Sequence, residues 1–186
     1  HNLNHIHMKD LNQHLFRLIV FILALGLASC ASFDPGWNYT VEKDGETDSY
    51  VLLNEAFQIE ENAGSAEEVE ALIDKLKEAE KADPDNYLTL WKIGNYHILM
   101  GAAYAEKRKD KKYHYREAIK YCEKAMCTNE SFKAEVTNGV DMTDAIGKLT
   151  LNEIDAMGYW YTARFYYFAE VLRPMGRVIN TRIVID

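Results

Sequence analysis

The strongest internal signal in this sequence is Leu90-Trp-Lys-Ile-Gly-Asn-Tyr-His97. Its large residues recur at helical spacing around one small residue, Gly94. A glycine lets another backbone approach closely, while large side chains fill the space around that contact. Downstream, Ala118, Cys122 and Ala125 place small side chains at intervals of three and four residues. We therefore predict two helices that pack as a pair, with their smallest residues at the closest contacts.

Part of the same pattern occurs once more, upstream. Leu76, Ala79 and Pro84 match the end of an earlier second helix with the same spacing. Two partial copies in register resemble tetratricopeptide repeats, in which a large residue, a leucine, a glycine and an aromatic recur at fixed offsets. The expected fold class is therefore all-α, with antiparallel helix pairs stacked as a short solenoid.

Helical periodicity extends toward the N-terminus as far as Ser49. Residues 51–59 suggest a first helix, and Ser65 is placed to cap a second one. Glu67 and Glu68 would lie in the first turn of this second helix, where their charge suits the helix dipole. Its apolar stripe consists of Val69, Leu72, Ile73, Leu76 and Ala79. No alternating pattern typical of a sheet is present, and only residues 177–186 are rich in β-branched side chains.

An aromatic helix is predicted to start near Thr150 or Asn152 and to run to about Leu172, before Pro174. A helix that is apolar over so much of its circumference needs more than one neighbour. One stripe, expected to face inward, contains Ile154, Met157, Tyr161, Phe168 and Leu172. A second stripe, roughly 100° round the helix, contains Trp160, Ala163, Tyr167 and Val171.

Two interpretations of this helix stay open. It could be the central helix of a solenoid, buried on both sides. Alternatively its side chains also line a concave groove, because tyrosine combines apolar area with a polar tip. On the second interpretation, the candidate groove or partner-binding residues are Trp91, Tyr96, Tyr159, Trp160, Arg164, Tyr166 and Tyr167.

The sequence holds no pattern typical of catalysis. His97 and His114 each stand alone in a helical pattern, without a paired cysteine, serine or carboxylate at a defined spacing. We therefore expect no enzyme activity, no metal site and no cofactor. The basic cluster at 107–112 is interpreted as a solvated loop or helix end rather than as a binding patch.

Two cysteines lie close together in a predicted helix. Cys122 and Cys127 are expected to be small apolar residues of that helix. A continuous helix would hold their Cα atoms too far apart for a disulfide. A bond becomes possible only if the helix ends before Cys127.

The N-terminal residues have the layout of a secretory signal. Met8 is the expected start, and the apolar run 18–28 is about half the length that crosses a bilayer. The run ends in Leu27-Ala-Ser-Cys30, which resembles the lipobox of bacterial lipoproteins, where cleavage leaves a lipid-modified cysteine. The alternative is a soluble periplasmic protein with an incidental cysteine. The expected parts are residues 1–29, upstream residues plus signal peptide; 30–46, a flexible tether; and 47–186, the helical domain.

The charge balance narrows the class of partner. The net charge is −8 over the whole chain, and removal of residues 1–29 changes it to −9. An acidic balance argues against nucleic acid, or an anionic membrane face, as the main partner.

Residues 48–186 resemble the T component associated with TRAP transporters. The matching segments are Asp83-Pro-Asp-Asn-Tyr87, Leu90-Trp-Lys-Ile-Gly94, Tyr104-Ala-Glu-Lys107, Tyr121-Cys-Glu-Lys-Ala125 and Met157-Gly-Tyr-Trp-Tyr161. The resemblance implies a periplasmic lipoprotein with a tetratricopeptide-like fold that assembles as a trimer. It also implies further helices after Asp186, so the helical domain is expected to be C-terminally truncated.

The expected function follows from these features together. The chain would be a scaffold anchored to the membrane through lipid on Cys30, on the periplasmic side and at the outer rather than the inner membrane. The resemblance implies that it partners the solute-binding protein of a TRAP-type uptake system and binds a small hydrophobic ligand. The alternative is a general envelope-assembly scaffold that binds peptides or proteins.

Overall fold

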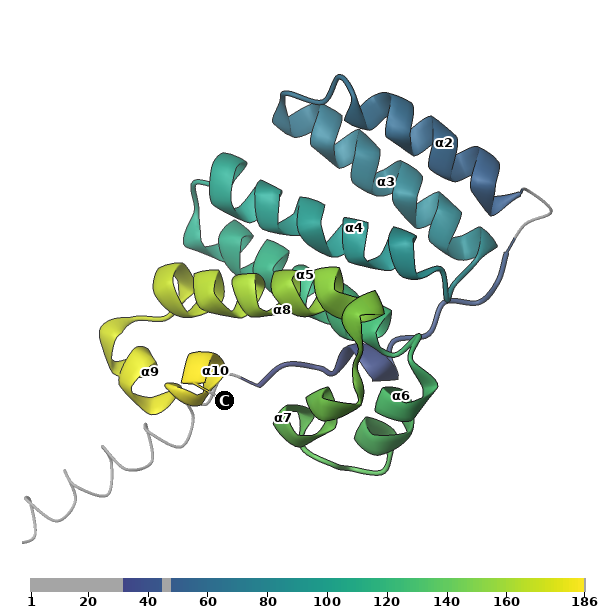
Figure 1. Cartoon of the computed structure of the whole chain (residues 1–186). Helices are drawn as coiled ribbons and strands as arrows, with labels where there is room; N and C mark the ends of the chain where they lie inside the picture. Colours follow the sequence, from purple (N-terminus) through teal and green to yellow (C-terminus); the bar gives the residue numbers. More distant parts are fainter. Residues whose placement is uncertain (1–31, 45–47, 186) are drawn as a thin grey trace, which may run out of the picture.

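The computed structural model describes residues 32–44 and 48–185, and over these ranges the chain is all-α, with nine α-helices and no strand. Neighbouring long helices pack antiparallel (Figure 1). The α-helices are α2 (Ser49–Glu60), α3 (Ala66–Ala82), α4 (Tyr87–Leu99), α5 (Arg108–Met126), α6 (Glu130–Thr137), α7 (Met142–Ala145), α8 (Ile154–Tyr166), α9 (Pro174–Ile179) and α10 (Arg182–Ile185). Shorter 3₁₀ or π segments are η1 (Gly36–Asn38), η2 (Met100–Tyr104), η3 (Ile146–Lys148), η4 (Leu151–Glu153) and η5 (Tyr167–Val171).

The pair α2 and α3 forms one end of the stack (Figure 1). Ser65 caps α3, as predicted, through a capping box: its hydroxyl accepts from the Glu68 N–H at 3.3 Å, and the Glu68 carboxylate accepts from the Ser65 N–H at 2.9 Å. The predicted apolar stripe of α3 is buried throughout. The sequence prediction for this helix is confirmed.

Helices α4 and α5 approach each other most closely at Gly94. A β-carbon on Gly94 would lie 2.6 Å from the Cys122 Sγ and 3.3 Å from the Ala118 carbonyl oxygen. The predicted pairing of a glycine with small residues is therefore confirmed. Asn86 fixes the start of α4, since its side chain accepts the Thr89 N–H at 3.0 Å.

The sequence supports predictions for both ends of α5: the basic cluster at its start and the two cysteines near its end. The helix starts at Arg108, so the basic cluster at 107–112 lies at a helix end, as expected. It ends at Met126, immediately before Cys127, which is the condition under which a disulfide was possible. Cys122 and Cys127 are nevertheless free, buried thiols.

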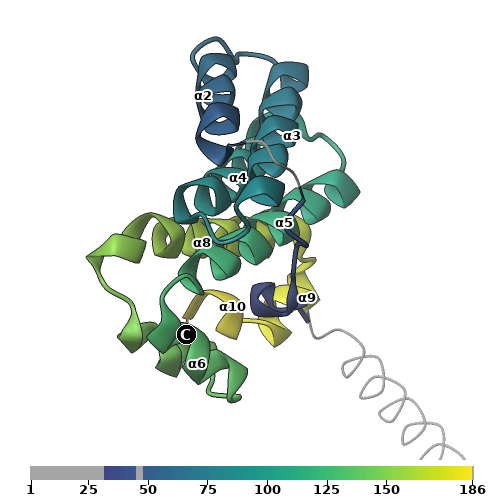
Figure 2. The same ribbon diagram turned by 90° about the vertical axis from the view of Figure 1, so that its right-hand side faces the viewer.

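The prediction of which α8 stripe faces inward is wrong. Trp160 is buried, whereas Ile154 and Tyr161 are each 53% exposed. Both stripes are apolar, so periodicity could not choose between them. Ala156 and Ala163 are fully buried and leave room for α4 and α5 beside α8, while the other stripe offers only large side chains. Figure 2 shows α8 lying across α5.

The β-branched segment at the C-terminal end is helical. Pro174 occupies the first turn of α9, where its missing N–H costs nothing. After α9 the chain turns back, and α10 packs against α8. Ile183 of α10 is buried beside Val171 in a small apolar core.

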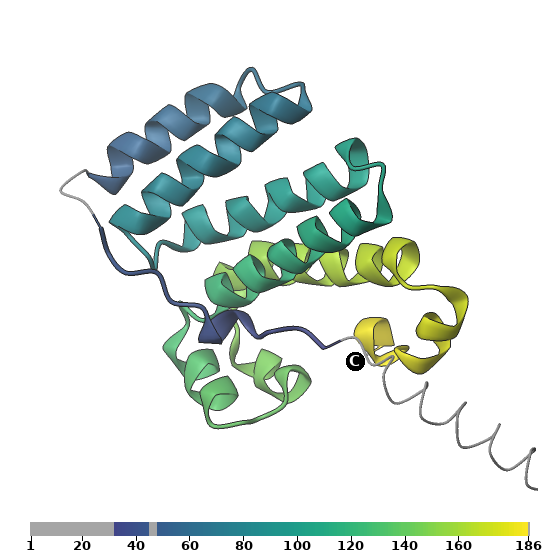
Figure 3. The same cartoon turned by 180° about the vertical axis from the view of Figure 1, so that it is seen from behind.

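The flexible tether predicted for residues 30–46 is corrected over the described part, 32–44. This N-terminal segment lies along the domain rather than away from it (Figure 3). Gly36 packs so tightly on α5 that a β-carbon there would lie 2.2 Å from the Lys120 carbonyl oxygen. Phe33, Trp37 and Tyr39 pack against the core, a gain of buried apolar area that glycine and proline content alone does not reveal.

Candidate functional site

One surface gathers aromatic side chains from α2, α4 and α8; we call it the aromatic face, and it comprises Phe57, Trp91, Lys92, Tyr96 and Tyr159. The rings of Trp91 and Tyr159 stack, with centroids 5.5 Å apart and planes 9° apart. The Lys92 Nζ lies 5.3 Å from the Trp91 ring centre and 5.2 Å from that of Phe57. Because Phe57, Trp91 and Tyr159 are only half-buried, the face presents apolar surface beside a cation.

Glu60 fixes the polar side of the aromatic face. Its carboxylate accepts hydrogen bonds from the Lys92 Nζ at 2.7 and 2.9 Å, and from the Tyr96 hydroxyl. Burial acts to raise the pKa of Glu60, but these two donors outweigh it and the pKa lies below its usual value. Burial, and then Glu60 itself, raise the pKa of Tyr96. At neutral pH an ion pair therefore joins α2 to α4.

A separate pocket of about 330 Å³ lies between α8 and α10. Trp160 and Arg164 form part of its wall, with the guanidinium carbon 4.3 Å from the Trp160 ring centre. The Arg164 Nε donates to the Ile183 carbonyl at 2.7 Å. A second guanidinium nitrogen of Arg164 donates to the Arg182 carbonyl at 3.2 Å, so this side chain holds α10 against α8. The mainly apolar wall suits the apolar part of a small ligand. The other lining residues are Ile146, Met157, Tyr161 and Val184.

Glu123 lies behind Trp160 in the core. Its carboxylate accepts the Gly36 N–H at 2.7 Å and the Trp160 Nε1–H at 3.1 Å. Burial raises the pKa of Glu123 to about 7, although these hydrogen bonds and the charge of Arg164 act to lower it. One buried carboxyl group therefore ties both the N-terminal segment and α8 to α5.

Tyr166 and Tyr167 occupy a third place. Tyr166 stacks on Tyr115 with ring centroids 5.6 Å apart, and buried Tyr167 meets Phe33 edge-on at 5.0 Å. These contacts belong to the small apolar core beside α10. The seven predicted groove residues are thus divided among the aromatic face, the pocket and this core, and do not line a single groove.

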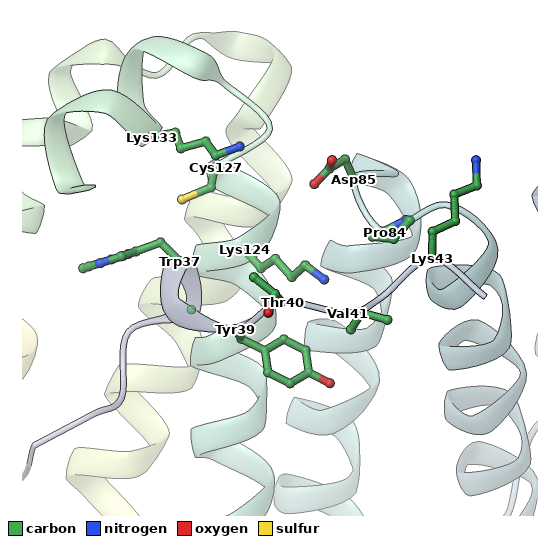
Figure 4. A pocket seen from close by; sticks show the side chains of 11 residues that line it. Trp37, Tyr39, Thr40, Val41, Lys43, Pro84, Asp85, Lys124, Cys127 and Lys133 are labelled. Atoms are coloured by element: carbon green, nitrogen blue, oxygen red, sulfur yellow. The ribbon is translucent and has the colours of Figure 1, made fainter. Parts of the chain in front are cut away.

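Figure 4 shows a cavity of about 420 Å³ between the N-terminal segment, the α3–α4 turn and α6. Lys43, Lys124, Lys133 and Asp85 line it. Lys124 is already engaged, since its Nζ lies 2.7 Å from the Glu80 Oε1. The rest of the lining includes Trp37, Tyr39, Val41, Pro84 and Cys127, so the cavity presents apolar surface together with charged groups of both signs.

The structure brings together two histidines that the sequence analysis treats as isolated. The Nδ1 atoms of His97 and His114 lie 3.1 Å apart. Burial holds the pKa of His97 well below its ordinary value, and its Nε2 has no hydrogen-bond partner in the described part of the chain. In two antiparallel helices, residues that lie equally far before and after the connection come close together. His97 of α4 and His114 of α5 lie about equally far from the connection at 100–107, so their positions in the sequence were the available signal for this pair.

Among the residues that the structure describes, no group of three or more histidine, cysteine or acidic residues is arranged to hold a metal ion. Nor does any helix within 32–44 and 48–185 have the length and apolar character to cross a membrane. Cys30 and the signal-like run 18–28 lie outside the described residues.

Comparison with known proteins finds no match, whether to a family model, to a curated protein or to a solved structure.

Proposed function

We propose that this chain is a lipid-anchored, tetratricopeptide-like scaffold on the periplasmic side of a bacterial membrane, and that it binds a partner protein through the aromatic face. The stacked pair of Trp91 and Tyr159 carries this proposal. Both rings are half-buried, and the Lys92 Nζ lies 5.3 Å from the Trp91 ring centre. Large aromatic side chains dominate the binding energy of protein interfaces, and they cost little conformational entropy when they are already held in place.

The helix arrangement supports a binding role. Helices α2, α4 and α8 are joined by Glu60 at one contact and by the Trp91–Tyr159 stack at the other. Repeated helix pairs that share a face in this way form extended surfaces that bind other molecules. An adaptor of this kind needs no catalytic group, and we propose no enzyme activity for this protein.

The partner we propose is the solute-binding protein of a TRAP-type uptake system, with the outer membrane as the site of anchoring. The resemblance of residues 48–186 to the T component supports this choice, and so does the lipobox-like segment before Cys30. The pocket between α8 and α10 is the proposed site for the small hydrophobic ligand. Trimer formation is part of the same proposal. The alternative is an envelope-assembly scaffold that uses the aromatic face for peptides.

A titration against a TRAP-type solute-binding protein from the same organism tests the proposal. The double variant Trp91→Ala/Tyr159→Ala is expected to bind at least about thirtyfold more weakly, since a single interface anchor contributes on the order of 2 kcal/mol. Tyr50→Ala is the matched control, because Tyr50 is 73% exposed on α2 and is not part of the aromatic face. Equal affinity of the double variant and the control would exclude the aromatic face as the partner site.

Anchoring is tested separately. Cys30→Ala should release the protein from membranes, and the pelleted and soluble fractions report this directly. A Cys30→Ala protein that still fractionates with the membrane would contradict the lipid anchor.

A further inference from the structure

The surface of α9 and α10 differs from the rest of this acidic chain. Between Val171 and Ile185 there is no acidic residue, and three arginines are present. Met175, Val178 and Ile179 lie on one face of α9, because they are three and four residues apart, and all three are exposed. Met175 is 70% exposed and Val178 is 73% exposed. The three arginines are Arg173, Arg177 and Arg182, all exposed.

The N-terminal segment is fixed beside this surface. Phe33 packs into the same small core as Ile183 of α10 and meets Tyr167 at 5.0 Å. The guanidinium of Arg116 lies 5.4 Å from the Phe33 ring centre and donates to the Ser32 carbonyl at 2.8 Å. Figures 1 and 3 both show this end of the segment next to α10.

The spacing of the chain limits how far the anchor lies from α9 and α10. Cys30 precedes Phe33 by three residues, which span at most about 10 Å even when fully extended. A lipid on Cys30 would therefore hold the α9–α10 surface within a short distance of the bilayer.

We propose that the α9–α10 surface rests on the membrane, with Met175, Val178 and Ile179 in the headgroup region and the arginines on anionic phospholipid headgroups. This inference rests on the proposed lipid anchor, and it requires that the further helices expected after Asp186 leave the outward face of α9 uncovered. Short apolar faces flanked by arginine are typical of helices that lie in the membrane interface. The contact orients the helix stack and directs the aromatic face toward its partner in the periplasm.

The overall acidity of the chain does not oppose this contact. Screening limits electrostatic interactions to about 8 Å at physiological ionic strength, so only nearby charges matter. Of the carboxylates close to the N-terminal segment and η5, Asp34 lies 4.0 Å from Arg116, and Glu170 lies 2.5 Å from the Lys111 Nζ. Each of these carboxylates has a cation beside it.

The exposed guanidinium of Arg177 donates hydrogen bonds to the Leu172 carbonyl at 3.1 Å and to the Ala169 carbonyl, which hold it at the surface of α9. Near α10, hydrogen bonds from Thr143, and then the charges of Arg182 and Arg164, lower the pKa of the exposed Asp141 carboxyl group, so this carboxylate too lies near cations.

The test places an environment-sensitive fluorophore on Val178→Cys in the acylated protein. Cys122 and Cys127 are buried, so the new thiol is the accessible one among the described residues. Glu61→Cys, in the α2–α3 turn at the other end of the stack, is the control position. Both proteins are reconstituted in vesicles of phosphatidylethanolamine and phosphatidylglycerol, with and without nitroxide-labelled lipid.

We expect blue-shifted emission and nitroxide quenching at position 178 and neither at position 61. In Arg173→Gln, the equilibrium constant for contact should fall about fivefold. It should fall further when phosphatidylcholine replaces phosphatidylglycerol. A label at 178 that behaves like the label at 61 overturns the proposal. A blue shift that nitroxide lipid does not quench also overturns it, because a second copy or a protein partner then covers the surface. Flotation of the protein with the vesicles reports the Cys30 anchor independently.

Discussion

The two sides of α5 are built by different means. Toward α4 the contact is apolar and very close, with Gly94 against Cys122 and Ala118. Toward α8 and the N-terminal segment, the contact depends on a buried carboxyl group, Glu123, and on the Nε1–H of Trp160. The first side is made by shape alone, and the second by shape together with hydrogen bonds that must all be satisfied. The α4 side therefore defines the repeat, and the α8 side fixes how the termini attach to it.

The largest expected effect is on the α8 side. Trp160→Ala should lower the free energy of unfolding by about 3–5 kcal/mol, since it leaves a cavity in the core and removes a hydrogen-bond donor from Glu123. Tyr161→Ala, at the next position but half-exposed, should cost less than about 1 kcal/mol. Urea unfolding of the two variants measures the difference. Equal losses would show that the Trp160 stripe is not the buried side of α8.

The buried carboxyl group of Glu123 should make the free energy of unfolding depend on pH. This effect arises on the α8 side of α5 and not on the α4 side. The folded protein keeps a proton on Glu123 up to about pH 7, whereas the unfolded chain releases it near pH 4.5. The free energy of unfolding should therefore fall as pH rises through this window, by about 3 kcal/mol at most. In Glu123→Gln this fall should be absent. His97 acts in the opposite direction, because its lowered pKa costs stability below about pH 6.5, but it is present in both proteins.

The measurement for Glu123 is the difference between the two unfolding curves from pH 4.5 to pH 8. His97 and the surface carboxylates cancel in that difference. A difference that does not change with pH would mean that Glu123 is charged in the folded state throughout.

On the α4 side, the expected effect of a single methyl group is smaller. Gly94→Ala should destabilise the fold by about 1–3 kcal/mol, because the new β-carbon would lie within 2.6 Å of the Cys122 Sγ and the helices must separate. In the double variant with Cys122→Ala, part of this loss should return, since the sulfur that the methyl group meets is gone. Thermal unfolding of the four proteins gives the coupling. A loss that Cys122→Ala does not relieve would place the strain elsewhere.

The sequence predicts the α4 side of α5 better than the α8 side, for a physical reason. A close helix contact needs small residues at helical spacing. Gly94 and Ala118 are such residues, so the local sequence of each helix indicates the contact between α4 and α5. The partners of Glu123 lie at positions 36 and 160, and no local period links them. Long-range hydrogen bonds of this kind leave no pattern along the chain.

The same reason explains the two main errors. The N-terminal segment has the composition of a linker, yet Gly36 and Phe33 dock it onto α5 and η5. On α8, two equally apolar stripes compete, and only the small residues Ala156 and Ala163 show which one is covered. The sequence predicts the aromatic face in part. Trp91, Tyr96 and Tyr159 belong to one set of candidate groove residues, but no local pattern predicts that the rings of Trp91 and Tyr159 stack.

The smallest expected effect is a stabilisation, and it comes from Gly158 of α8. This glycine differs from Gly94 of α4 in its surroundings. Gly158 lies on the exposed side of α8, and a β-carbon there would meet no atom within 4 Å. Gly158→Ala should therefore raise the free energy of unfolding by about 0.5–1 kcal/mol, since alanine loses less backbone entropy than glycine in a helix. Thermal unfolding beside Gly94→Ala tests this. If Gly158→Ala destabilised the protein as Gly94→Ala should, another surface would have to cover that side of α8. The aromatic face beside Tyr159 would then be an occupied interface.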